Sequence, residues 1–222
     1  MLRTFTLHEV WILVLAARWT IALSLAAFAG GGAVGLILAI ARISPFKALR
    51  YIASGTIQFV QAIPALMLLL LFYYGLNLFG IRIDAWTAAV LAFTLSTSAF
   101  LAEIWRGCLQ AVPAGQWDAA RSLGLNFPKA LILVIIPQAV RMALPPTVGY
   151  MVQVVKGTSL AALIGFTELA KAGAQINTIT FEPVLVFGTV AGIYFLICWP
   201  LSLLSGYLER QLKVGHVNVQ AM

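Results

Sequence analysis

Apolar stretches long enough to cross a lipid bilayer follow one another along almost the whole chain. Apolar residues make up 62% of the 222 residues and charged residues only 9%, whereas a soluble domain has about 45–50% and about 25%. A membrane-spanning helix needs about 20 predominantly apolar residues. Long alternating strand patterns, as in a membrane barrel, are not seen. The sequence therefore predicts an all-α polytopic membrane protein.

Five membrane-spanning helices are expected. They cover roughly residues 19–43, 56–78, 85–105 and 183–208, with another region that starts near Lys129 and is broken by Pro137 and by Pro145 and Pro146. Residues 7–17 are apolar but short, which favours a segment lying along the membrane interface. Residues 156–181 contain scattered charges and glycines. They predict a broken helix or a re-entrant hairpin, which is tolerated at membrane depth where protein or water covers it.

Lysine and arginine residues collect on one side of these spans. They are Arg42, Lys47, Arg50, Arg106, Arg121, Lys129, Arg141, Arg210 and Lys213. Because cytosolic loops are enriched in Lys and Arg, this side is expected in the cytosol, with the N-terminus outside and the C-terminus inside. The net charge of +7 is then explained by loops facing the membrane surface. A nucleic-acid partner would need a soluble basic face, and none is expected.

The chain is expected to form one transmembrane domain. Residues 1–18 would be an outside or interfacial segment, residues 19–212 the five-helix core, and residues 213–222 a cytosolic tail. The longest cytosolic loop would cover about residues 106–130. A signal peptide is not favoured, because Arg18 interrupts the first apolar run.

The loop between the third and fourth spans has its own start and stop signals. Pro113 ends the preceding helix, and residues 117–123 can form about two helical turns. Gly124 is well placed to close this short helix. Asn126 and Pro128 then suit the cap and first turn of the next helix. The short helix can either pack on its own protein or be offered to a partner.

The same loop carries a spaced motif, which reads Asp118, Ala119, Ala120, Gly124, Val134, Ile136 and Pro137. It resembles the cytosolic signature of ABC-importer permease subunits: Glu/Asp-Ala-Ala, three residues, Gly, nine residues, Ile/Val, one residue, Leu/Ile, Pro. Strings at residues 99–103, 115–124, 137–146 and 156–160 resemble the polar amino-acid branch of that family. The resemblance covers roughly residues 20–212. One departure is Gln61, which stands where the branch usually has Arg.

The resemblance implies an ABC type I importer transmembrane fold in the bacterial cytoplasmic membrane. Two permease chains, identical or homologous, would pair, and each loop would dock on one subunit of a separate ATP-binding dimer. An extracytoplasmic binding protein would deliver a polar amino acid. ATP and Mg would be bound by the partner, because this chain has no Gly-x4-Gly-Lys-Ser/Thr loop; it would not itself be an enzyme. The coupling residues would be Trp117, Asp118, Ala119, Ala120, Arg121, Leu123, Gly124 and Phe127.

Polar side chains within or beside the spans are candidates for the substrate pathway, because polar groups in a membrane are costly. They are Ser96, Ser98, Glu103, Lys156, Thr158 and Ser159. Each also has a structural interpretation. Glu103 can pair with Arg106, and Glu168 with Lys171, each three residues apart. Hydroxyls often bond their own backbone, and a lysine can extend to the interface.

Nothing in the sequence predicts a metal site or a catalytic centre. His8 and His216 lie near the termini, away from any cluster of metal ligands. Two other classes stay open: an ion-driven secondary transporter, and a channel or membrane interaction protein without an energy source. The first predicts inverted repeats, of which no clear trace is seen. Both leave the motif of residues 118–124 unexplained.

Overall fold

The computed structural model describes residues 4–213, which contain helices and no strands. The elements are α1 (Leu7–Ile43), α2 (Lys47–Ala62), α3 (Ala65–Leu70), the π-helix η1 (Leu71–Gly75), α4 (Leu76–Leu78), α5 (Ala85–Ala111), α6 (Ala114–Ser122), α7 (Phe127–Ala130), the π-helix η2 (Leu131–Ile135), α8 (Ile136–Gly157), the 3-10 helix η3 (Thr158–Ile164), α9 (Leu169–Thr180) and α10 (Pro183–Lys213). Four helical stretches are long and apolar enough to cross a membrane, and the bent α2–α4 segment makes up to five. The expected all-α membrane fold is confirmed.

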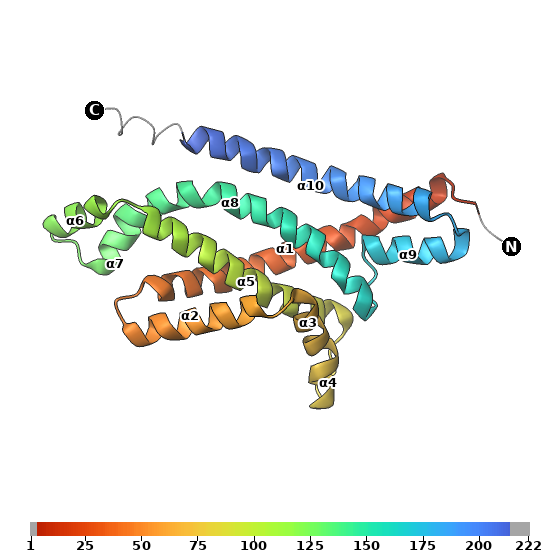
Figure 1. The fold of residues 1–222 in the computed structure, drawn as a ribbon, viewed down its shortest axis with the longest axis horizontal. Coiled ribbons are helices and arrows are strands. Elements are labelled where there is room, and N and C mark those ends of the chain that lie inside the picture. Colours follow the sequence, from red (N-terminus) through yellow and green to blue (C-terminus); the bar gives the residue numbers. More distant parts are fainter. Residues whose placement is uncertain (1–3, 214–222) are drawn as a thin grey trace.

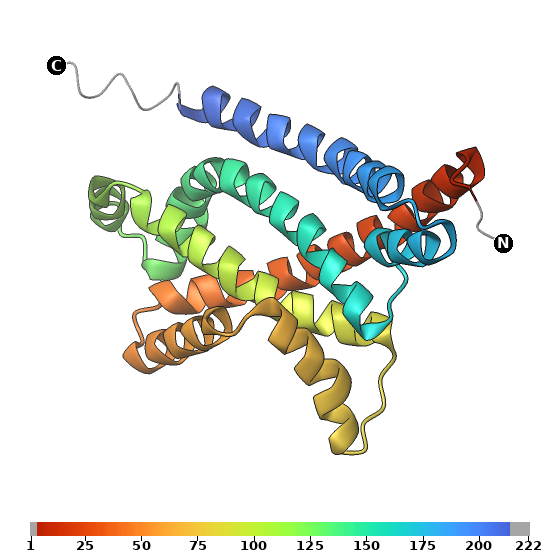
Figure 2. The same cartoon turned by 45° about the vertical axis from the view of Figure 1, so that its right-hand side comes forward.

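The long helices α1, α5, α8 and α10 extend along the long axis of the molecule (Figure 1). The α6–α7 loop lies at the same end as the α1–α2 turn and the C-terminal end of α10. At the other end, α9 lies near the start of α1, and α3 and α4 project away from the long helices (Figure 2). The described chain thus starts and finishes at opposite ends, as an odd number of crossings requires.

Close packing of α1 on α5 forms the centre of the fold. Gly31 and Gly35, one turn apart, are both buried. A Cβ atom added at Gly31 would lie 2.6 Å from Cβ of Thr97, and one at Gly35 would lie 2.9 Å from the carbonyl oxygen of Ser98. Small residues let helix backbones approach in a membrane, where packing drives association. These glycines therefore set the distance between α1 and α5.

The N-terminal segment, expected to be separate from the first span, forms one continuous helix with it. Residues 7–17 belong to α1 and continue without interruption into the first span. Thr6 begins the helix in a capping box, its backbone N–H donating to the Glu9 carboxylate at 2.9 Å. Leu13 is fully buried in a cluster shared with α9 and α10. Tertiary packing therefore extends the helical core to the start of α1.

The second predicted span, residues 56–78, is broken in the structure. Helix α2 ends at Ala62, and the following helical segment starts at Ala65 at an angle of 95°. Pro64 explains the break, because proline lacks a backbone donor and disfavours helical geometry at the residue before it. Ile63 is accordingly extended, with φ −95° and ψ 125°.

The fourth span is less broken than expected. Pro145 and Pro146 lie inside α8, which continues to Gly157. A neighbouring helix bonds to the backbone at this point, since the Ser205 hydroxyl donates to the Pro145 carbonyl at 2.8 Å. The carbonyls that lose their helical donors to these prolines are those of Arg141 and Met142, four residues earlier, and membrane helices tolerate such losses where neighbours or local backbone adjustments satisfy the freed groups. Pro137 lies in the first turn of α8, directly after the π-helical turn η2, which changes the hydrogen-bond register there.

The expected break within residues 156–181 is confirmed. The 3-10 helix η3 ends at Gly165, whose φ of +87° lies in the left-handed region. Helix α9 then starts at Leu169, with the Glu168 carboxylate accepting the backbone N–H of Lys171 at 2.9 Å. The chain thus reverses direction at the end of the bundle opposite α6 (Figure 1).

Glu168 does not form the expected side-chain pair with Lys171. Its carboxylate is fully buried and accepts hydrogen bonds from the hydroxyls of Thr20, at 3.2 Å, and Tyr194, at 2.7 Å. Buried polar groups need such partners, because an unsatisfied one is costly. Glu168 therefore joins α1, α9 and α10, a structural role.

Candidate coupling loop and transport pathway

The short loop helix forms where the sequence predicts it, with a start three residues earlier. Helix α6 begins after Pro113 and ends before Gly124, whose φ is +74°. The Gly124 N–H bonds the Arg121 carbonyl at 2.9 Å, and the Leu125 N–H bonds the Ala120 carbonyl at 3.1 Å. This pair of bonds is a Schellman cap, which needs a left-handed residue at the glycine position.

The next helix also starts as predicted. The Asn126 side chain accepts the Lys129 backbone N–H at 3.3 Å, and Pro128 lies in the first turn. Because α6 ends in a local cap and α7 begins with one, the path of the connection between them is defined by its own sequence.

One face of α6 packs on the subunit itself. Trp117 stacks on Phe127, with ring centroids 5.7 Å apart and planes at 17°. Ala120 is 2% exposed, and Trp117 and Phe127 border a buried cluster that includes Leu109 and Leu131. These three residues of the expected coupling set therefore fix α6 to α5 and α7.

The other face of α6 is open. Leu123 is 80% exposed, and Ala119 is also exposed. Asp118 and Arg121 form an exposed ion pair three residues apart. A partner would meet a large apolar side chain, a small one and a charge pair.

Most of the expected pathway residues form hydrogen bonds with groups three residues away in the same helical segment. Ser98 and Thr158 are fully buried, and their hydroxyls donate to the Leu95 and Val155 carbonyls at 2.7 and 2.8 Å. The predicted pairing of Glu103 with Arg106 is confirmed, with Nε of the arginine 2.9 Å from both carboxylate oxygens.

Two more of the expected pathway residues, Lys156 and Ser159, lie close together where α8 continues into η3. The Ser159 hydroxyl donates to the Lys156 carbonyl at 2.7 Å. Lys156 itself is exposed. Its charged group is therefore open to the surroundings of the subunit.

Ser96 lies in a different environment, a cavity of about 300 Å³ between α3, α5 and α8. The cavity is lined by Ala65, Phe93, Ser96, Thr97, Phe100, Tyr150, Gln153, Val154 and Gly157. Phe100 and Tyr150 stack across it, with centroids 5.5 Å apart. The sequence reasoning missed Tyr150 and Gln153. Their spacing of three residues, continued at Gly157, places them on one face of a helix, and this was the available signal.

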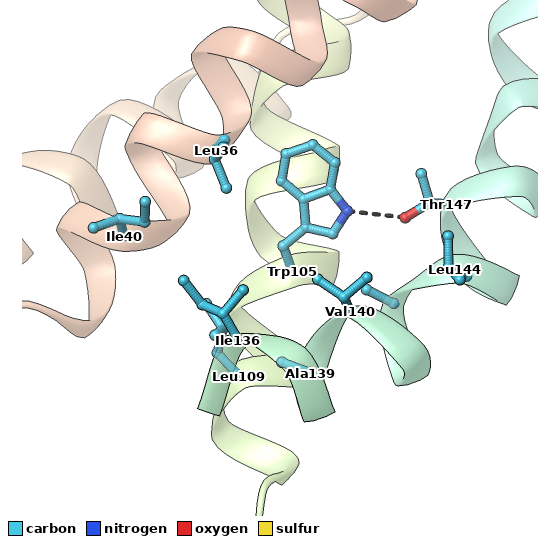
Figure 3. Close-up of a pocket in the computed structure, with 10 residues that line it drawn as sticks. Leu36, Ile40, Trp105, Leu109, Ile136, Ala139, Val140, Leu144 and Thr147 are labelled. Carbon is cyan, nitrogen blue, oxygen red and sulfur yellow. Dashed lines mark hydrogen bonds between the residues drawn. The ribbon is translucent and has the colours of Figure 1, made fainter. Parts of the chain in front are cut away.

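A second cavity, of about 240 Å³, lies between α1, α5 and α8 (Figure 3). Aliphatic side chains such as Leu36, Ile40 and Val140 line it. Its two polar side chains bond to each other, Nε1 of Trp105 donating to Oγ1 of Thr147 at 2.9 Å. Among the described residues, no charged group lines this cavity, so it is poorly suited to a zwitterion.

Gln61 connects α2 to α5. Its side-chain amide donates to the Ala99 carbonyl at 3.2 Å. In this chain, the position where the polar amino-acid branch usually has Arg is therefore used for packing between helices. The bonded residue, Ala99, lies one turn along α5 from the cavity residue Ser96.

These features define the class: a multi-pass membrane subunit of a transport system, with an exposed loop helix at its basic end. The chain belongs to the binding-protein-dependent transport system inner membrane components, whose family model matches residues 31–214. The expected membership in the ABC-importer permeases is thereby confirmed, and the two alternative classes lose their support.

Three known proteins are similar over most of their length. The probable glutamine ABC transporter permease GlnM of Bacillus subtilis is 34% identical over 89% of this chain and 91% of its own. The L-cystine transport system permease TcyB of the same organism is 35% identical over 87% and 83%. The crystal structure of an amino acid ABC transporter with histidines is 34% identical, with a TM-score of 0.84, over 90% and 94%. The expected importer fold is confirmed.

Proposed function

We propose that this chain is the permease subunit of an ATP-driven importer of polar amino acids. The observation that carries the proposal is the exposed helix α6, closed by a Schellman cap at Gly124, at the basic end of an importer fold. Similar chains are named for glutamine and L-cystine, which supports the amino-acid class. Because these two relatives are about equally similar to this chain, their names do not identify the transported amino acid. Its identity has to be inferred from the residues that line the pathway.

The coupling role rests on the two faces of α6. The open face, with Leu123 and the Asp118–Arg121 pair, would dock on an ATP-binding subunit that holds ATP and Mg. The inner face, through Trp117 and Phe127, would pass its displacement to α5 and α7. Such coupling requires two global states with different contacts in each. A rigid attachment of α6 to the spans suits this task.

Orientation and the remaining partners follow from the positions of the charges. The end with α6 would face the cytosol, because the lysine and arginine residues collect there. The end with α9 would then face an extracytoplasmic binding protein. A second permease chain, identical or homologous, would complete the pathway between the two subunits.

The cavity beside Ser96 is the best candidate for the pathway. Hydroxyl, phenol and amide groups from Ser96, Tyr150 and Gln153 can donate to a carboxylate and accept from an ammonium group. Among the described residues, no charged side chain lines the cavity. A neutral lining favours an uncharged polar amino acid. Lys156, one turn further along α8, would attract the carboxylate.

The first test is co-purification from uptake-competent membranes. The tagged chain is expected to bring an ATPase subunit with it in equal amounts. Replacing residues 118–124 with a Gly/Ser linker of equal length is expected to release that subunit, because the open face of α6 is removed. A chain that purifies alone, while uptake in the membranes is intact, would refute the proposal.

Gln153→Leu tests the pathway. The apparent KM for amino-acid uptake is expected to rise about tenfold, since a lost hydrogen bond to a charged group costs about 1.5–3 kcal/mol. Affinity of the binding protein for the amino acid should not change. Gln58→Leu is the matched control, because Gln58 lies on the exposed face of α2 and bonds only Ser54 at 3.3 Å among the described residues. Equal KM values for both variants would remove the cavity from the pathway.

A further inference from the structure

A cavity lined by three arginines lies at the basic end of the subunit. Arg42 at the end of α1, Arg50 on α2 and Arg121 on α6 border about 690 Å³ of space, together with Gln110 and Trp117. We call this the arginine pocket. The consecutive helices α1 and α2 and the distant helix α6 thus each place an arginine at the same cavity.

The charges in the arginine pocket are only partly compensated. Arg121 is paired with Asp118. Within the part of the chain that the structure describes, neither Arg42 nor Arg50 has a carboxylate in ion-pair distance, and no acidic residue lines the pocket. Glu103, on α5, is already bonded to Arg106. Two guanidinium charges are left for an external anion.

Arg42 also has an unsatisfied donor. Its Nε atom is buried and has no hydrogen-bond partner among the described residues. Leaving such a group unpaired is costly, and more so when it is charged. A guanidinium group matches the oxygens of a phosphate, which can accept two parallel hydrogen bonds. The pocket therefore has the chemistry of a phosphate site.

The surroundings of the pocket point to the membrane as the source of the anion. Phe46, Tyr51 and Ile52, which flank Arg50 in sequence, are 72%, 73% and 68% exposed. Aromatic and aliphatic side chains beside cations are typical of the interface between headgroups and acyl chains. Arg42 ends a membrane-spanning helix, so the pocket lies at the level of the lipid headgroups.

We propose that the arginine pocket binds the phosphate group of an anionic membrane phospholipid. Basic pockets between membrane helices bind such headgroups. The lipid would bridge Arg42 and Arg50, on the membrane helices, to Trp117, on the inner face of α6. It would thereby stabilise the position of the loop helix relative to the bilayer. This site goes beyond the proposed transport function, because binding of the phospholipid can be measured in the absence of transport.

The test is native mass spectrometry of the full-length chain in its purified complex, with dioleoyl phosphatidylglycerol as the probe and dioleoyl phosphatidylcholine as the neutral comparison. The double variant Arg42→Gln/Arg50→Gln is expected to lower the affinity for phosphatidylglycerol about tenfold or more, given the contribution of each cation near an anionic surface. Arg82→Gln, which removes an exposed cation from the α4–α5 connection, should have no effect.

Two further variants separate binding from folding. Arg42→Lys/Arg50→Lys keeps the charges but not the paired guanidinium donors, and it should bind more lipid than the glutamine pair and less than the parent. Ala114→Glu places a carboxylate at the pocket without removing an arginine, and it should also release the lipid. Unchanged phosphatidylglycerol binding in Arg42→Gln/Arg50→Gln would overturn the proposal. Loss of the ATPase subunit with lipid binding intact would also overturn it, because the pocket would then serve an acidic partner segment.

Discussion

Replacing Gly124 with valine is expected to abolish most ATP-coupled uptake while the protein stays inserted in the membrane. Gly124 has φ +74°, and a Cβ atom there would meet nothing within 4 Å. The effect is therefore conformational and not steric crowding by neighbours. The left-handed region costs about 1–2 kcal/mol for a residue with a side chain, and a β-branched residue is particularly unsuited to it. The Schellman cap would open.

Opening the cap would displace Leu123 and the Asp118–Arg121 pair from the surface they present. Coupling free energies between sites are about 1–3 kcal/mol, so uptake in proteoliposomes is expected to fall about tenfold or more. Gly124→Asn is the matched control, because asparagine adopts the left-handed conformation more readily. It should retain most of the uptake. ATP-dependent uptake by the valine variant at the level of the parent would rule out α6 as the coupling element.

The loop helix could be predicted because its signals are local. Pro113, Gly124 and Asn126 each act within a few residues of their own position, through missing donors, backbone conformation or a side-chain cap. Such signals do not depend on what packs nearby. The predicted helix was therefore found, and only its first turn was missed.

The proline positions show where sequence reasoning fails. Pro64 breaks its helix, whereas Pro145 and Pro146 do not. At Pro145 the chain stays helical and also contacts α10, where the Ser205 hydroxyl donates to the Pro145 carbonyl. That contact joins residues 60 positions apart and cannot be read from local sequence. For the same reason, Glu168 was expected to pair with Lys171 but bonds Thr20 and Tyr194 instead.

The pathway residues were only partly predictable. Ser96 and Ser98 lie two residues apart, and a helix turns about 200° over that distance. Ser96 therefore lines the cavity, whereas Ser98 is fully buried, with its backbone carbonyl beside Gly35 of α1. Composition alone gives no reason to separate them. Which face of α5 borders the cavity depends on where α3 and α8 pack against it, and those positions are not encoded in the local sequence of α5.

Replacing Gly35 with leucine is expected to prevent accumulation of the folded protein. A Cβ atom at Gly35 would lie 2.9 Å from the Ser98 carbonyl oxygen and 3.3 Å from the Ala102 backbone nitrogen. Both neighbours are backbone atoms of α5, so neither can rotate away. Overpacking of a core costs about 1–3 kcal/mol, and a whole side chain forced between two backbones belongs at the upper end. The yield of monodisperse protein and its thermal midpoint in detergent measure the effect.

Gly188→Leu on α10 is the matched control, because a Cβ atom there meets nothing within 4 Å. The same substitution in the same kind of helix should leave yield and midpoint close to those of the parent. Equal midpoints for Gly35→Leu and Gly188→Leu would show that α1 and α5 are not in close contact. The helix pair at the centre of the fold, to which α2, α3 and α8 attach, would then have to be arranged differently. The cavity beside Ser96, which is built on α5, would lose its basis as well.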